Sequence, residues 1–255
     1  MLIRKEYLFK PSIPCSIDYN YQHDIMQNIY YYLSTVNKDI EKSLYNEGYR
    51  HESGHRFKLF GHTLRFKNAK FNKENIVLNE DSVVSLIVTG KTDVIRNIVN
   101  GLLHVKKIKT NNVELNLFSA NNDSKIKFKK IMLYKTLSPV VESTKNNKYY
   151  SPYESEYYIN LVNNLKRKYQ LMHGKEYTDE IYFDIENALD IKKKCFKMKN
   201  GYINGYNYNI WVEASPDMQK IIYYLGLGQN NSVGAGILSY ITGRNAIWKE
   251  HIMNL

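Results

Sequence analysis

The sequence has few cysteines and no long apolar run, and both shortages exclude classes of protein. Its 255 residues include two cysteines, Cys15 and Cys195, which lie far apart and form no C-x-x-C pair. This excludes a disulfide-dense secreted domain and a zinc site built from four cysteines, and a reducing, cytoplasmic location is expected. No apolar run approaches the roughly 18 residues needed to cross a membrane, so no membrane-spanning segment is expected. The charged first residues, MLIRKEYLF, do not resemble a secretory signal.

Acidic residues are scarce relative to basic ones. Thirty-six Lys and Arg residues face 25 Asp and Glu residues, which gives a formal net charge of +11. A surplus of this size favours polyanionic partners through counterion release, nucleic acid first and an acidic membrane surface second. The 23 tyrosines add flat rings on which unpaired bases can stack. An AT-rich genome, which enriches Lys and Asn, is the alternative explanation of the charge.

The spacing of apolar residues divides the chain into two similar halves. The first half alternates strand and helix patterns, which we expect at residues 1–9 (strand), 22–45 (helix), 56–71 (strand), 83–90 (strand), 92–104 (helix) and 113–120 (strand). The second half repeats this order, at residues 125–139 (strand), 151–174 (helix), 180–214 (two strands or a hairpin), 215–226 (helix) and 234–241 (strand). Both halves therefore read β-α-β-β-α-β.

This order predicts an α+β protein of two tandem ferredoxin-like (RRM-like) domains. The polar stretch SANNDSK places the boundary near residue 122, which gives domains at 1–122 and 123–255. Ser151, Pro152 and Glu154 form a capping pattern at the start of one predicted helix. Ser215 and Gly226 are the expected ends of the last helix.

A glycine-rich segment, GLGQNNSVGAG, occupies residues 226–236 and is called the glycine loop below. It lacks the G-K-[ST] of a phosphate-binding P-loop. A dinucleotide-binding fingerprint runs strand, glycines, helix, whereas this loop runs helix, glycines, strand. Both nucleotide-binding interpretations therefore fail. Two remain: a helix end packed tightly on a sheet, and a loop that offers neutral hydrogen bonds from Gln229, Asn230, Asn231 and Ser232.

The glycine loop resembles the signature G-h-G-x-x-N-S-x-G-h-G, with h apolar, of the CRISPR-associated Cas6 family. These proteins are repeat-processing endoribonucleases of the RAMP superfamily. Further stretches are similar in the same order along nearly the whole chain, namely YNYQHDIMQNIYYYL, FKLFGHTL, TLSPVVEST, SEYYINLVNNLKRKY and KKKCFKMKNGY. The resemblance implies metal-independent cleavage of CRISPR repeat RNA without a cofactor, in which a ribose 2′-hydroxyl attacks the phosphate and leaves a 2′,3′-cyclic phosphate.

Such a reaction needs a proton acceptor, a proton donor and positive charge near the phosphate. The resemblance places the family's tyrosine at Tyr30, with Tyr31 as the alternate one residue later, and its lysine at Lys58. The resemblance places the family's histidine at Asn46, or at Tyr45 with a shift of one residue, and the amide of Asn46 does not relay protons near neutral pH. Nearby His51 is the expected replacement, with His55 as its alternate, because histidine titrates near neutrality.

His51 and His55 also belong to HESGH, which matches the H-E-x-x-H zinc-hydrolase motif. That motif must lie on a helix so that both histidines share one face. Here Gly48 and Gly54 disfavour a helix, and the residues after His55 alternate like a strand. We therefore expect HESGH to be a loop and expect no metal site.

The densest basic run is KKKCFKMK, a strand-like segment suited to tracking phosphates. A solvated strand edge is the alternative. The predicted RNA-binding residues are those of this run and of the glycine loop: Lys192, Lys193, Lys194, Lys197, Lys199, Gly226, Gly228, Gln229, Asn230, Asn231, Ser232, Gly234 and Gly236.

Three functions compete at this stage: an endoribonuclease that processes CRISPR repeat RNA, a repeat-RNA-binding protein without cleavage activity, and a zinc hydrolase. Asn46 supports the second, and the third depends wholly on His51 and His55. CRISPR repeat RNA is the expected partner. A second copy of the chain and proteins of an interference complex stay open as further partners.

Overall fold

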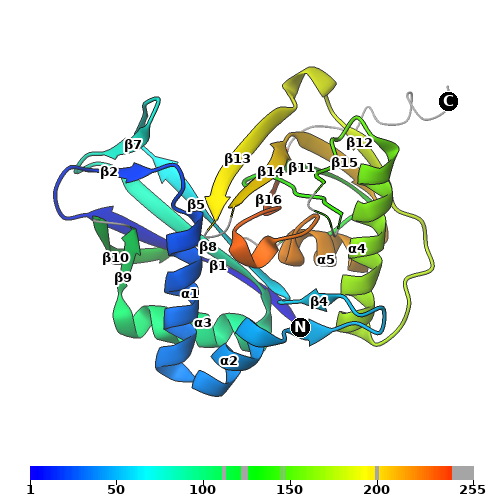
Figure 1. Ribbon diagram of the computed structural model, residues 1–255, viewed down its shortest axis with the longest axis horizontal. Helices are drawn as coiled ribbons and strands as arrows, with labels where there is room; N and C mark the ends of the chain where they lie inside the picture. Colours follow the sequence, from blue (N-terminus) through cyan, green and yellow to red (C-terminus); the bar gives the residue numbers. More distant parts are fainter. Residues whose placement is uncertain (111–112, 122–125, 145, 147, 199–200, 243–255) are drawn as a thin grey trace.

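The computed structural model describes residues 1–110, 113–121, 126–144, 146, 148–198 and 201–242. Two α+β domains lie side by side (Figure 1), the N-terminal one in blue to green and the C-terminal one in green to red. None of the described helices is long and apolar enough to span a membrane.

The N-terminal domain is built on a five-stranded antiparallel sheet in the order β5-β8-β1-β10-β9. Its elements are β1 (Leu2–Pro11), β2 (Cys15–Asp18), α1 (Gln22–Val36), α2 (Lys38–Asn46), β3 (Tyr49–Arg50), β4 (Arg56–Phe57), β5 (Phe60–Lys67), β6 (Lys70–Phe71), β7 (Asn75–Leu78), β8 (Val83–Lys91), α3 (Thr92–Val105), β9 (Lys107–Thr110) and β10 (Val113–Asn121). Strands β5, β8, β1 and β10 are the second, third, first and fourth strands of a ferredoxin-like unit, in that unit's spatial order.

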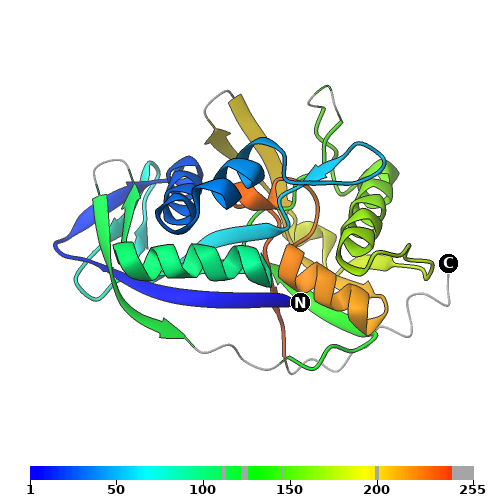
Figure 2. The same cartoon turned by 90° about the horizontal axis from the view of Figure 1, so that it is seen from below.

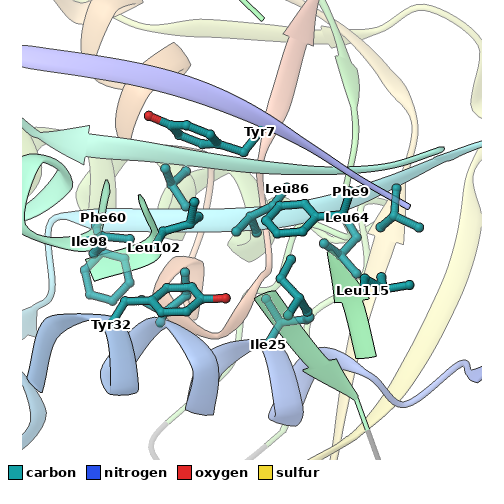
Figure 3. Packing of buried hydrophobic residues seen from close by; sticks show 14 of the residues in the cluster. Tyr7, Phe9, Ile25, Tyr32, Phe60, Leu64, Leu86, Ile98, Leu102 and Leu115 are labelled. Atoms are coloured by element: carbon teal, nitrogen blue, oxygen red, sulfur yellow. The ribbon is translucent and has the colours of Figure 1, made fainter. Parts of the chain in front are cut away.

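Helices α1 and α3 lie on the same side of β1 (Figure 2) and cover one face of this sheet. Alternate residues of each strand point to that face, so Phe9 of β1 and Leu86 of β8 are fully buried. Tyr32 of α1 and Leu102 of α3 pack into the same core (Figure 3). Burial of these apolar side chains holds the helices against one face of the sheet. The other face is left for the C-terminal domain.

The C-terminal domain repeats the plan with a four-stranded sheet in the order β12-β15-β11-β16. Its elements are β11 (Ile131–Thr136), α4 (Ser155–His173), β12 (Tyr182–Ile185), the 3-10 turn η1 (Ala188–Asp190), β13 (Lys192–Met198), β14 (Gly201–Asn207), β15 (Asn209–Glu213), α5 (Pro216–Leu225), the 3-10 turn η2 (Asn231–Val233) and β16 (Leu238–Tyr240). Strands β13 and β14 form a hairpin between the second and third strands of the unit. The predicted tandem ferredoxin-like fold is confirmed.

Several predicted boundaries need correction. The predicted helix 22–45 is two helices, because Asn37 leaves the helical conformation and its side chain caps α2 by accepting from the backbone of Asp39 and Ile40. Helix α4 begins at Ser155 rather than after Ser151, because Ser151 and Glu154 close a turn of their own before the helix. The predicted boundary at residue 122 lies outside the described residues. Helix α5 begins after Ser215 and ends at Gly226, as predicted.

The second domain covers part of the free face of the N-terminal sheet. Helix α5 contacts β1, β5 and β8. Thr89 of β8 donates a hydrogen bond to the carbonyl of Tyr224 (2.8 Å), and the guanidinium of Arg4 donates to the carbonyl of Leu238 (2.6 Å). Arg4 also lies over the ring of Tyr223, 4.7 Å from its centroid. These polar contacts fix how the two domains meet, and this places the glycine loop beside β5.

Candidate functional site

The base of the glycine loop is a tight backbone crossing. The N–H of Leu227 donates to the carbonyl of Gly236 (2.9 Å), so the two ends of the loop lie directly against each other. A Cβ on Gly236, whose φ is +67°, would stand 1.9 Å from the Leu227 carbonyl oxygen, so only glycine fits there. Gly226 and Gly234 are buried in the same base. These three glycines allow close packing of the base, and RNA contact remains a prediction for the loop, including its crest, residues 228–232.

Lys168 of α4 holds the glycine loop from beneath, and the sequence analysis missed it. Its ammonium group donates to the carbonyls of Gly226 (2.9 Å) and Gly228 (3.0 Å) and to the side-chain oxygen of Asn231 (2.8 Å). The side chain is only 3% exposed, and burial lowers the pKa of Lys168. Asn231 in turn donates to the carbonyls of Leu227 (3.0 Å) and Ala235 (3.1 Å). One buried cation and one amide thus fix the shape of the loop.

The loop also docks on the N-terminal domain through β5. His62 donates from Nε2 to the carbonyl of Ser232 (3.2 Å), and its ring is buried. Burial lowers the pKa of His62 to about 4, so the ring is neutral at neutral pH. A Cβ on Gly61 would lie 3.2 Å from the carbonyl oxygen of Asn231. The sequence alone leaves open whether His62 packs or faces solvent; in the structure it packs against the loop.

A cavity of about 550 Å³ opens beside the crest and is called the inter-domain cavity below. Its walls come from both domains: residues 55–60 of the N-terminal domain, and residues 142–144 and 228–232 with one face of α4 from the C-terminal domain. Four basic side chains line it: Arg56, Lys58, Arg167 and Lys168. Its size is in the range of small-ligand sites, and its charge favours an anion.

Lys58 connects the inter-domain cavity to the end of α2. Its ammonium group donates to the carbonyls of Leu44 and Tyr45, where a cation complements the negative end of the helix dipole. Burial and the neighbouring charge of Arg56 lower the pKa of Lys58. Arg56 donates to the carbonyl of Asn46 (3.2 Å), whose own side chain is exposed. Asn46, the predicted position of the family's histidine, therefore lies next to two cations.

The two predicted tyrosines lie in different surroundings. Tyr30 is half-buried and packs edge-on against Tyr45 and Phe60, with ring centroids 5.3 and 6.2 Å apart. Burial, with contributions from Tyr45 and Glu41, raises the pKa of Tyr30 to about 12, so its hydroxyl stays protonated. Tyr31 is 56% exposed and lines a separate pocket with Lys107 and Lys109. Tyr30 thus lies behind the cavity wall formed by Phe60, whereas Tyr31 faces elsewhere.

HESGH forms the turn between β3 and β4, which confirms the predicted loop. The N–H of His51 donates to the carbonyl of His55 (2.8 Å), as in a hairpin rather than a helix. His51 is 7% exposed and does not line the inter-domain cavity, because Nε2 hydrogen-bonds Oε1 of Gln170 on α4 (2.7 Å). His55 is exposed and lines the cavity. Among the described residues no group of three or more His, Cys, Asp or Glu side chains is placed to hold a metal ion.

Ser53 links the two histidines. Its hydroxyl lies 2.7 Å from Nδ1 of His51 and 3.1 Å from Nδ1 of His55. Gln170 therefore anchors His51, and His51 orients the turn that presents His55. The sequence does not reveal which of the two histidines lines the cavity, because this depends on the contact between the turn and α4. One bond of that contact, from Gln170 to Glu52, joins residues 118 positions apart in the chain.

The lysine run occupies β13 and stands apart from the cavity. Lys192, Lys193, Lys194 and Lys197 are all exposed, and Lys199 lies outside the described residues. The β13–β14 hairpin is fixed to the body by Phe196, which packs against Val141 and Ala235. The N–H of Lys197 donates to the side chain of Asn20 in the N-terminal domain (2.9 Å), so the hairpin reaches across the junction of the two domains (Figure 1).

Comparison with known proteins agrees with this geometry. Residues 121–240, which include the glycine loop, match the family model of the CRISPR associated protein Cas6, C-terminal. The chain is 27% identical over 241 residues to the CRISPR-associated endoribonuclease Cas6 1 of Methanocaldococcus jannaschii, covering 90% of this chain and 89% of the relative. It is 32% identical over 107 residues to the CRISPR-associated endoribonuclease Cas6 of Pyrococcus furiosus, covering 40% of this chain and 39% of that protein.

The fold is shared as well. A solved structure of a CRISPR associated protein Cas6 superposes with a TM-score of 0.76 at 25% identity, covering 94% of this chain and all of that one. In sequence, in the glycine loop and in the tandem ferredoxin-like fold, this chain is therefore similar to Cas6 proteins along most of its length.

Proposed function

We propose that this protein is an endoribonuclease that cuts CRISPR repeat RNA within the inter-domain cavity. The observation that carries the proposal is the meeting of the glycine-loop crest with Arg56, Lys58 and Arg167 around one cavity. The Methanocaldococcus jannaschii relative, which bears the name endoribonuclease, aligns with 90% of this chain. A polyanion entering the cavity would meet fixed cations on one side and backbone and amide hydrogen bonds on the other.

The chemistry that fits these residues is attack by a ribose 2′-hydroxyl on the neighbouring phosphate. The 2′-hydroxyl loses its proton as its oxygen bonds to phosphorus, and the departing 5′-oxygen gains a proton. The products are a 2′,3′-cyclic phosphate and a 5′-hydroxyl. The reaction consumes no metal ion or cofactor, and its developing negative charge is stabilised by cations such as Lys58 and Arg56.

Within this scheme His55 is better placed than His51 to transfer a proton, because His55 lines the cavity and His51 is held by Gln170. His51 then acts as a positioning residue through Ser53. Tyr30 remains protonated and supports the wall behind Phe60. Outside the cavity, the β13 lysines supply the charge along which the rest of the RNA lies.

A second function is supported by Asn46, which stands at the place of the family's histidine and cannot relay a proton. With Asn46 there, binding of repeat RNA without cleavage is the alternative. Proteins of an interference complex and a second copy of the chain stay predictions that follow from the resemblance.

One assay separates the two functions. Purified protein is incubated with candidate repeat RNAs in EDTA under single-turnover conditions, and each RNA is matched by one with 2′-deoxyribose at the mapped cut. We expect products with a cyclic-phosphate end from the all-ribose RNA and none from the 2′-deoxy RNA. A shifted but intact RNA would support the binding protein, and cleavage that requires an added metal ion would contradict the mechanism.

A further inference from the structure

Two buried oxygen atoms on residues of the inter-domain cavity have no hydrogen-bond partner among the described residues. They are Oε1 of Glu142 and Oδ1 of Asn164. Glu142 is 1% exposed and Asn164 is 7% exposed, and both residues line the cavity. Buried polar atoms in folded proteins nearly always have partners, so an unpaired acceptor needs an explanation. Two such acceptors on residues of one cavity are candidates for contact with a ligand that carries donors.

The carboxylate of Glu142 is held in place for this task. Gln229 in the crest donates to Oε2 of Glu142 (3.0 Å) and to the carbonyl of Ser143 (3.0 Å), whose hydroxyl donates back to Oε1 of Gln229 (3.1 Å). Gly228 lies beside Oε1 of Glu142, where a Cβ would stand 3.3 Å away. Its neighbours therefore hold this carboxylate in place. Because residue 228 is glycine, no side chain covers Oε1 from that position. Burial raises the pKa of Glu142 to about 8 although Lys168 opposes this, and N–H donors from a ligand would favour the ionised form.

The neighbouring charges exclude a metal ion as the missing partner. Lys168 and Arg167 line the same cavity as Glu142, and Lys168 already fills its own bonds in the glycine loop. A metal ion would meet one carboxylate against two cations, which is an unfavourable balance. A group with N–H donors on one edge, facing the two acceptors, and with acceptors on another edge, facing Arg167, would fit these residues without that penalty.

Guanine has that arrangement among the four bases of RNA. Its Watson–Crick edge carries the N1–H and N2–H donors, which pair with carboxylate and amide oxygens. Its O6 and N7 are acceptors that pair with an arginine or lysine. Proteins that recognise single-stranded RNA read unstacked bases on these edges. Uracil, cytosine and adenine each present fewer donors on the corresponding edge.

We propose that the inter-domain cavity binds one unpaired guanine of the RNA, with Glu142 and Asn164 accepting from its Watson–Crick edge and Arg167 donating to O6 or N7. The inference rests on the proposed function, because it assumes that RNA enters this cavity. It adds a base preference that the resemblance and the catalytic residues do not supply. Glu142 and Asn164 are accordingly specificity-determining residues rather than catalytic ones.

The test uses labelled heptamers of the form U3-N-U3, in which N is guanosine, inosine, adenosine, cytidine or uridine. Affinity is measured by fluorescence anisotropy at low salt. We expect the guanosine RNA to bind at least about tenfold more tightly than the uridine RNA. Inosine, which lacks the N2 amino group, should fall between the two. Equal binding of all five RNAs by the wild-type protein would overturn the proposal while leaving the proposed function intact.

The variant Glu142→Gln should lose the preference for guanosine and keep its affinity for the uridine RNA. Glu156→Gln, an exposed change of equal charge at the start of α4, is the matched control and should keep the preference. A Glu142→Gln protein that retains the preference contradicts the role of Glu142. If that variant fails to fold, the comparison of guanosine with inosine on the wild-type protein still tests whether the cavity contacts the N2 amino group of guanine. Absence of binding to any heptamer and to a random-sequence 30-mer RNA would refute the proposed function and this inference together.

Discussion

The inter-domain cavity and strand β13 both carry positive charge, but they hold it differently. In the cavity Lys168 and Lys58 donate to backbone carbonyls, and both have lowered pKa values because of burial. On β13, Lys192, Lys193 and Lys194 are exposed and make no ion pair with any described residue. The first kind of cation is fixed in position, whereas the second is free to adapt to a flexible chain of phosphates.

The difference predicts different roles for the two groups of cations. Fixed cations shape the glycine loop and the wall of the proposed reaction site, so their loss should damage structure and catalysis. Adaptable surface lysines supply attraction that depends on salt and not on sequence. The predictions below test these roles, beginning with the change expected to have the largest effect.

His55→Ala should slow single-turnover cleavage by roughly 10²- to 10⁴-fold, the range lost when a general acid or base is removed. RNA affinity should stay near that of the wild-type protein. His51→Ala should slow cleavage less, because it acts through the position of the turn, and it should lower the melting temperature because the bond to Gln170 is lost. His104→Ala, at the exposed end of α3, is the control. A larger loss of cleavage in the folded His51 variant would restore His51 as the catalytic residue.

Lys168→Met should lower the free energy of unfolding by about 3 kcal/mol, because it leaves several buried acceptors of the glycine loop without a donor. Chemical denaturation in urea measures this. Lys166→Met on the same helix is the matched control and should change stability little. A loss below about 0.5 kcal/mol in the Lys168 variant would mean that the loop does not depend on this cation.

The stability of the protein should also fall in mild acid because of His62. Its pKa is about 4 in the folded protein and near 6.5 when unfolded, so between these values the unfolded chain binds more protons. The free energy of unfolding should therefore decrease by about 3 kcal/mol from this group as pH falls from 6.5 to 4. His62→Gln keeps a donor for the Ser232 carbonyl and does not titrate, so its pH dependence should be flatter. Parallel curves for the two proteins would contradict the assignment.

The smallest effect is expected for the double variant Lys193→Ala, Lys194→Ala. It should weaken RNA binding moderately at physiological salt and reduce the slope of log affinity against log salt by about 1 to 2. Stability should be unchanged because both side chains are exposed. Lys107→Ala with Lys109→Ala is the matched control of equal charge, since these lysines already pair with Glu114. An equal drop in slope for both variants would show only a loss of net charge.

The fold could be predicted because its strands and helices have clear apolar periods and occur in the order of two β-α-β-β-α-β units. The glycine loop was also visible, since G-x-G-x5-G-x-G is an unusual local pattern. The predicted start of α4 was wrong. Ser151 has the right residue type for a helix start, but Ser151 and Glu154 close a separate turn before the helix.

The site was less predictable because it is assembled by tertiary contacts. Lys168 shares a helical stripe with Leu161 and Leu165, and a charged residue on an apolar stripe was the available signal of a buried cation. Its partners lie about 60 residues further along the chain, so they could not be identified from spacing. Glu142 lies in TLSPVVEST, a stretch similar to the family, but nothing in that stretch singled it out, because its importance depends on burial beside the crest.

The most direct test of the account is to map where RNA touches the protein. Repeat RNA carrying 4-thiouridine is cross-linked to the wild-type protein, and the attached peptides are identified by mass spectrometry. We expect cross-links within residues 55–60, 142–144 and 228–232, which line the inter-domain cavity, together with weaker ones on β13. Cross-links confined to β13, with none in the three cavity segments, would contradict the claim that this cavity is the RNA site.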